Sequence, residues 1–170
     1  MSWLPLVLRL LHIGGGVFWA GATFVFAGFI EPTADAAGQD GARFLQRLAG
    51  GRYPVAMMVA GVTTVLAGIA LLGIDSGGFQ PAFMGSRLGV TLSIGGVCGI
   101  AAAVVGIGLA ARNAFRLKGV AAAIGTQKGG PTSEQLAQIA AIQGRLRFGG
   151  RLAATLLGIT VICMAIARYV

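Results

Sequence analysis

The sequence predicts an all-α fold, an integral membrane bundle of four helices, and two observations support this prediction. Of the 170 residues, 56% are hydrophobic and only 11% are charged, whereas soluble domains carry about 25% charged residues. Four apolar stretches are also long enough to cross a bilayer, which takes roughly 20 helical residues. These stretches do not alternate as barrel strands do, and a helix satisfies its own backbone groups without water. We therefore expect lipid to be the solvent of this chain.

The four predicted spans belong to one domain, residues 1–170, and contain few polar side chains. The first span holds Arg9 and His12, and the second has Thr63 and Thr64 as its strongly polar residues. The expected spans are residues 5–30, 54–74, 88–111 and 148–168, and the loops that carry most of the basic residues are 31–53 and 112–147.

Lysine and arginine gather in these two loops, which predicts the orientation of the bundle. Cytoplasmic membrane loops are enriched in Lys and Arg, so we expect both basic loops in the cytoplasm and both termini outside the cytoplasmic membrane. The net charge of +8 then favours anionic lipid headgroups as partners, and not nucleic acid. The basic residues are Arg43, Arg47 and Arg52 in the first loop, and Arg112, Arg116, Lys118, Lys128, Arg145, Arg147 and Arg151 in or beside the second.

Two segments of the basic loops carry helical signals of their own. Residues 41–49 place apolar and basic side chains on different sides of a helix, which is typical of a short interfacial helix. Thr132, with Gln135 at the third helical position, has the pattern of a capping box. We therefore expect the third and fourth helices to extend into the cytoplasm as a helical hairpin that breaks near residues 127–131.

Glycine is abundant, with 29 residues, and several glycines in or near the spans are four positions apart. The pairs are Gly85 with Gly89 and Gly95 with Gly99. Small residues at this spacing let membrane helices approach closely. We expect these faces to pack the bundle, or to join it to another copy or to a larger membrane complex.

One face of the first span carries the candidate site. His12 is the single histidine, and an ionisable residue inside a span is a functional hypothesis by default. Imidazole is a common axial ligand of haem iron, a glycine patch leaves room for a flat macrocycle, and an arginine can pair with a propionate. In the alternative reading, His12 only bonds a neighbouring helix, Arg9 extends to the interface and Trp19 only packs. The residues that share the face of His12 by helical spacing are Arg9, Gly15, Gly16 and Trp19.

The same span resembles a known superfamily. The segments LRLLHI at residues 8–13 and VFWAG at residues 17–21 combine a basic residue, a histidine three positions later and a Trp-x-Gly beyond it. This pattern is similar to the first helix of small bacterial membrane proteins that include the membrane-embedded protoporphyrinogen oxidase family, the copper-resistance D-like proteins and uncharacterised predicted integral membrane proteins. The resemblance implies haem b or another porphyrin around His12, with His12 as metal ligand, in a bacterial inner membrane.

Two further residues belong to this hypothesis. Arg87, at the outer start of the third span, can pair with a second propionate. It stands where the oxidase family has a lysine, and because a guanidinium does not deprotonate in a protein, it counts against the oxidase reaction and leaves enzyme activity open. A single histidine excludes bis-histidine haem within one chain, so a second axial ligand would be Met164 or the His12 of another copy.

Three functions therefore remain open. The first is a haem- or porphyrin-binding redox protein acting near the outer face. The second is a non-catalytic structural or accessory subunit of a membrane complex. The third is a permease for copper or another small solute, although copper(I) prefers thioether and thiolate ligands and the methionines form no ladder through the spans.

Overall fold

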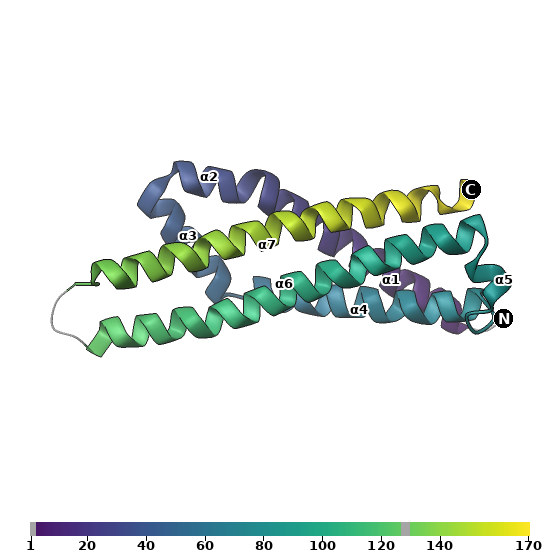
Figure 1. The fold of residues 1–170 in the computed structure, drawn as a ribbon, viewed down its shortest axis with the longest axis horizontal. Coiled ribbons are helices and arrows are strands. Elements are labelled where there is room, and N and C mark those ends of the chain that lie inside the picture. The colour runs from purple at the N-terminus through teal and green to yellow at the C-terminus, as the bar shows by residue number, and fades with distance from the viewer. Residues whose placement is uncertain (1–2, 127–129) are drawn as a thin grey trace.

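The computed structural model describes residues 3–126 and 130–170, and every regular element within these ranges is helical. Four helices in them are long and apolar enough to cross a membrane, which confirms the predicted all-α, multi-pass class. Figure 1 shows these helices running along one common axis. The candidate spans are Trp3–Ala36, Tyr53–Asp75, Arg87–Leu109 and Ser133–Tyr169.

The first helix continues beyond the expected end at residue 30. The backbone N–H of Glu31 bonds the carbonyl of Phe26, five positions back. Pro32 has no N–H to donate, and its ring would crowd the carbonyl of a regular helix, so the wider π-turn before it lets the helix continue where a stop was expected. The helix has three parts: α1 (Trp3–Val25), the π-helical η1 (Phe26–Ile30) and α2 (Glu31–Ala36).

The segment expected as loop 31–53 is largely helical. After α2, the chain turns at Gly38, whose φ of +60° favours glycine, and forms α3 (Gly38–Gly50). A Cβ on Gly41 would collide with the backbone of Ala34, so glycine allows α2 and α3 to touch. The helix expected at residues 41–49 lies inside α3 and is confirmed.

The second span, α4 (Tyr53–Asp75), leads through a glycine turn to the short α5 (Pro81–Met84). Of the glycine pairs expected to pack helices, the pair at 85 and 89 serves the corner between α5 and α6 instead. A Cβ on Gly89 would meet the carbonyl of Phe83 in α5. The four-residue spacing of this pair therefore reflects a local chain reversal.

The two longest helices, α6 (Arg87–Thr126) and α7 (Ser133–Ile166), form an antiparallel pair, and η2 (Ala167–Tyr169) follows α7. The hydroxyl of Thr132 accepts from the Gln135 N–H and the Gln135 side chain accepts from the Thr132 N–H, so the predicted capping box is confirmed. At about 1.5 Å per residue, the 40 residues of α6 span about 60 Å, twice the ~30 Å of a hydrocarbon core. Part of this helix pair therefore lies beyond the bilayer core.

The α6–α7 contact uses the second glycine pair as predicted. A Cβ on Gly95 would lie 2.9 Å from Cβ of Cys163, and one on Gly99 would lie 3.5 Å from Cγ2 of Thr160. The Thr160 hydroxyl donates to the Gly95 carbonyl at 3.0 Å. Close approach of α6 and α7 therefore depends on Gly95, whereas a methyl group at position 99 would make an ordinary contact.

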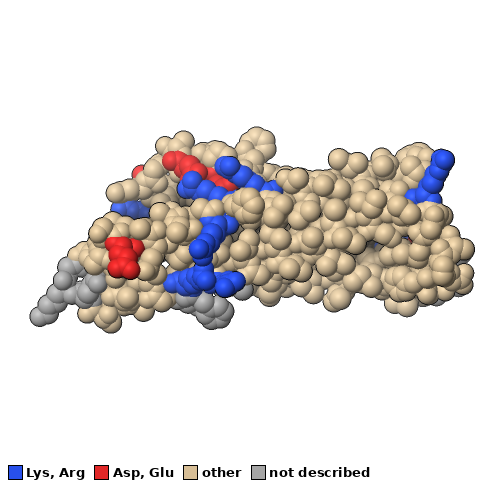
Figure 2. Space-filling model, viewed as in Figure 1, with Lys and Arg blue, Asp and Glu red and all other residues tan. Residues whose placement is uncertain are grey.

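Charge and apolar surface divide the bundle along its length. Both chain ends lie at one end, here called the terminal end, whereas α2, α3, the last turns of α6 and the first turns of α7 lie at the other, here called the connection end (Figure 1). Figure 2 shows charged side chains gathered over the connection end and an uncharged stretch in the middle of this face. Large apolar side chains such as Ile94 and Val104 are exposed, as expected of lipid contact. The main buried cluster among the described residues is small and consists of Trp19, Ala20, Ala102, Ala153 and Leu157.

Candidate functional site

The imidazole of His12 faces α4. Its Nδ1 lies 2.8 Å from the carbonyl oxygen of Thr64. A carbonyl only accepts, so Nδ1 carries the proton and donates. In the neutral ring Nε2 is then the unprotonated nitrogen, and the tautomer of His12 is set by the backbone of the neighbouring helix.

A glycine on α4 makes room for this ring. A Cβ placed on Gly68 would lie 2.7 Å from Cε1 and 2.9 Å from Nδ1 of His12. Real Cβ atoms do not approach other atoms so closely, so any side chain at Gly68 would displace the imidazole. Gly68 and the Thr64 carbonyl are therefore the residues of the second span that position His12.

Gly15 and Gly16 lie against Thr64, and the bare patch expected to face a macrocycle is occupied by that side chain. A Cβ on Gly15 would lie 2.7 Å from Oγ1 of Thr64, and one on Gly16 would lie 3.4 Å from its Cγ2. Oγ1 of Thr64 is buried without a hydrogen-bond partner among the described residues. The glycine patch of α1 therefore packs α4 directly.

Trp19 completes the contact between α1 and α4. Its side chain is 7% exposed, and a Cβ on Gly61 would lie 3.2 Å from Cε2 of the indole. Bulky groups thus alternate across the contact: His12 and Trp19 of α1 enter gaps on α4, and Thr64 of α4 enters a gap on α1. We refer to this set of residues as the α1–α4 seam.

Arg9 lies toward the terminal end from the seam and reaches Asp75, the last residue of α4. Nη2 of Arg9 is 3.8 Å from Oδ1 of Asp75, with side chains 61% and 44% exposed. Exposed pairs of this kind contribute little to stability. The Arg9 guanidinium therefore remains available to a ligand near His12.

The other two predicted cofactor residues lie elsewhere. Arg87 is exposed and lines a shallow groove with the C-terminal Val170. Met164 lies on α7, and its Cε would be 3.0 Å from a Cβ on Gly95 of α6. No contact within residues 3–126 and 130–170 brings either residue to His12.

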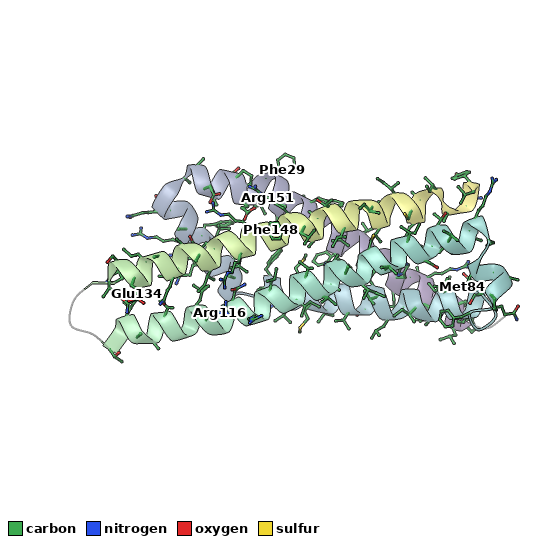
Figure 3. All side chains as sticks on the ribbon, in the orientation of Figure 1. Phe29, Met84, Arg116, Glu134, Phe148 and Arg151 are labelled. Carbon is green, nitrogen blue, oxygen red and sulfur yellow. The ribbon has the colours of Figure 1, made fainter. Side chains whose placement is uncertain are left out.

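One buried carboxylate was not predicted from the sequence. Glu31 is only 6% exposed, and its Oε2 is 4.0 Å from Nε of Arg151 on α7. One helical turn closer to the connection end, the Asp35 carboxylate accepts a hydrogen bond from Arg147 at 2.8 Å. Figure 3 shows Arg151 between α7 and the first helix. The sequence signal was the matching spacing, four positions between the acids and four between the arginines.

Comparison with known proteins adds no identification: no protein-family profile, curated protein or solved structure matches the chain. The likeness of the first span to porphyrin-handling membrane proteins therefore stays an expectation. Within the part of the chain that the structure describes, no three His, Cys, Asp or Glu side chains converge as a metal site would require.

The donor set fits a porphyrin iron in one respect and departs from it in another. His12 with Nδ1–H on a backbone carbonyl is the arrangement that orients metal-binding histidines and makes their second nitrogen more basic. The space over Gly15 and Gly16 is filled by Thr64, so a macrocycle does not fit inside the α1–α4 seam. A porphyrin held by Nε2 of His12 would have to lie outside that contact.

Proposed function

We propose that this protein is a haem- or porphyrin-binding redox protein of the bacterial inner membrane, with His12 as the one axial ligand that each chain supplies. The observation that supports it is the 2.8 Å hydrogen bond from Nδ1 of His12 to the Thr64 carbonyl. It leaves Nε2 as the ligand nitrogen and holds the ring before any iron binds.

The proposed topology puts the connection end in the cytoplasm and both termini outside. Its support is the concentration of Lys and Arg at the connection end, as in cytoplasmic loops. The parts of α6 and α7 beyond the bilayer core are then cytoplasmic. His12 and Arg9, nearer the terminal end, lie in the outer half of the membrane.

Each residue of the site has a distinct proposed task. A bound haem would supply one-electron transfer. His12 would hold the iron, the α1–α4 seam would keep the imidazole from rotating, and Arg9 would pair with a propionate in place of its 3.8 Å contact with Asp75. Electron transfer is favoured over porphyrin oxidation because Arg87 cannot release a proton. A second axial ligand would come from the His12 of another copy, since Met164 packs on Gly95.

The test is an absorption spectrum of protein purified from haem-replete cells. We expect a Soret band that is lost in His12→Gly and restored when free imidazole is added, because imidazole can enter the vacated position. The matched control is Leu11→Ala, an exposed neighbour on α1, which keeps the band. Colourless wild-type protein with helical circular dichroism would contradict the proposal.

A second candidate function, a non-catalytic subunit that assembles through α1, has its own support. Gly14, Gly21 and Gly28 recur every seven positions, and a Cβ on any of them would meet nothing within 4 Å. Such a face suits close approach of another membrane helix. We expect Gly21→Leu to abolish cross-linked oligomers in bilayers, whereas Gly119→Leu, also open but outside the spans, leaves them intact. Wild-type protein that is monomeric in bilayers would exclude this function.

A further inference from the structure

A groove of about 420 Å³ lies between α6 and α7 in the connection half of the molecule. Its floor is apolar, with Ile142 buried, and arginines from the two helices stand over it. Figure 2 shows basic side chains continuing across this face of the pair. The residues that line this groove include Arg116 and Val120 of α6 and Gln138, Ala141, Ile142 and Arg145 of α7.

The two arginines of this groove form no ion pair with any acidic residue that the structure describes. The chain has five acidic residues, and four of them pair with other arginines, at positions 9, 43, 147 and 151. The fifth, Glu134, lies further toward the connection end than Arg116 (Figure 3). In residues 3–126 and 130–170, neither Arg116 nor Arg145 forms an ion pair. Two guanidiniums over one apolar groove therefore call for an anion from outside.

The distance of the two arginines from the ends of the membrane spans indicates the source of this anion. Phe148 is 70% exposed and begins the fourth span expected from the sequence; Figure 3 shows it on α7. At about 1.5 Å per residue, Arg145 lies about 4.5 Å beyond Phe148, and Arg116 lies about 7.5 Å beyond residue 111, where the sequence predicts the end of the third span. The polar headgroup layer extends roughly 5–8 Å from the hydrocarbon, and arginine stems reach toward it. The groove therefore opens at the level of lipid phosphates.

The apolar floor strengthens the binding of such a phosphate. Val120, Ala141 and Ile142 keep water from one side of the guanidiniums, and a lower local dielectric strengthens their attraction for an anion. Guanidinium forks match phosphate oxygens in geometry. A lipid also keeps its acyl chains in the bilayer beside the α6 and α7 spans, whereas a soluble anion has no such anchor.

We propose that this groove is a binding site for the headgroup of an anionic phospholipid, with Arg116 and Arg145 holding one phosphate from two helices. The site is independent of His12 and of the proposed haem, and it does not depend on which side of the membrane the connection end faces. Its consequence is that a lipid joins the two long helices just outside the bilayer core.

The experiment measures phospholipid binding to detergent-purified protein by native mass spectrometry, with phosphatidylglycerol and phosphatidylcholine titrated separately. We expect phosphatidylglycerol to bind more tightly than phosphatidylcholine. Arg116→Gln/Arg145→Gln should weaken phosphatidylglycerol binding about tenfold or more, given the attraction of each basic residue near an anionic surface. The control Arg47→Gln/Arg52→Gln, which removes the same charge elsewhere in the connection half, should change binding less than about twofold.

A further variant and a competition experiment complete the test. Arg145→Lys keeps the positive charge and loses the forked guanidinium, so it should cause an intermediate loss of phosphatidylglycerol binding. If the double variant fails to fold, this single variant still tests the proposal. Inorganic phosphate is added in competition and should not displace the lipid. Equal loss in the Arg47/Arg52 control, unchanged binding in the Arg116/Arg145 variant, or displacement by free phosphate would each overturn the proposal.

Discussion

The α1–α4 and α6–α7 contacts are both antiparallel helix pairs built on glycine, yet they place different groups in the glycine gaps. On α4, the gaps at Gly68 and Gly61 hold an imidazole and an indole, from His12 and Trp19. Across the α6–α7 contact, the gaps at Gly95, Gly99 and Gly149 hold Cβ of Cys163, the methyl group of Met164, the Thr160 side chain and the isobutyl group of Leu109. The first contact is built mainly from rings, and the second mainly from small or aliphatic groups with one hydroxyl, that of Thr160.

The difference shows which of the two helix contacts fixes the orientation of its side chains as well as their packing. An alkyl or thioether group in a glycine gap contributes dispersion, which depends on distance and little on orientation. The His12 ring also donates to the Thr64 carbonyl, so its angle and its proton position are both fixed. Packing two helices together does not require a fixed ring angle and proton position. This is why we propose His12, within the α1–α4 seam, as the ligand.

The largest effect is expected at Trp19. Trp19→Ala removes a 7% exposed indole from the core and should lower the free energy of unfolding by about 3–5 kcal/mol, as for large aromatic truncations. Reversible unfolding in mixed micelles measures it. The control is Trp3→Ala, since Trp3 is 76% exposed, and it should leave stability nearly unchanged. Equal losses of unfolding free energy in the two variants would contradict the assignment of the α1–α4 seam to the core.

A smaller effect, specific to the seam, is expected at Gly68. Gly68→Ala places a Cβ 2.7 Å from Cε1 of His12, and overpacking of this kind costs about 1–3 kcal/mol. The displaced ring should also lose its bond to the Thr64 carbonyl, which a change in the imidazole NMR shifts reports. Gly99→Ala, whose Cβ would meet Thr160 at an ordinary 3.5 Å, should move neither quantity. If Gly68→Ala leaves the imidazole shifts unchanged, the seam does not constrain His12.

Sequence patterns predicted the elements that depend on local chemistry. The four spans follow from apolar length, and the capping box at Thr132 and Gln135 follows from two adjacent side-chain preferences. The passage of the first helix through Pro32 was missed because the π-turn is a backbone adjustment with no residue signature. The same limit applied to the pair at Gly85 and Gly89, whose spacing suits both a helix contact and a turn.

The site was predicted only as one face of one helix. Helical spacing placed Arg9, Gly15, Gly16 and Trp19 on the side of His12, and the structure shows the last three with His12 in one contact. What faces them was not predictable, because the register of α1 against α4 depends on how Gly61, Gly68 and Thr64 fit together. The pairing of Glu31 with Arg151 likewise joins elements far apart in the chain.

The smallest change in the free energy of unfolding is expected at the polar contact of α6 with α7. Its size tests how far the α1–α4 and α6–α7 contacts differ. The Thr160 hydroxyl is shared between the Gly95 carbonyl and the Leu156 carbonyl of its own helix, each at 3.0 Å. Thr160→Val keeps the shape and removes this shared bond, so it should lower the free energy of unfolding by only about 0.6 kcal/mol, the average for such bonds between membrane helices. His12→Leu should cost more in the same assay, because its ring occupies the gap at Gly68 and donates to a single acceptor. If Thr160→Val proves the costlier substitution, the α6–α7 contact is the more specified of the two, and the case for a ligand nitrogen in the α1–α4 seam loses its structural support.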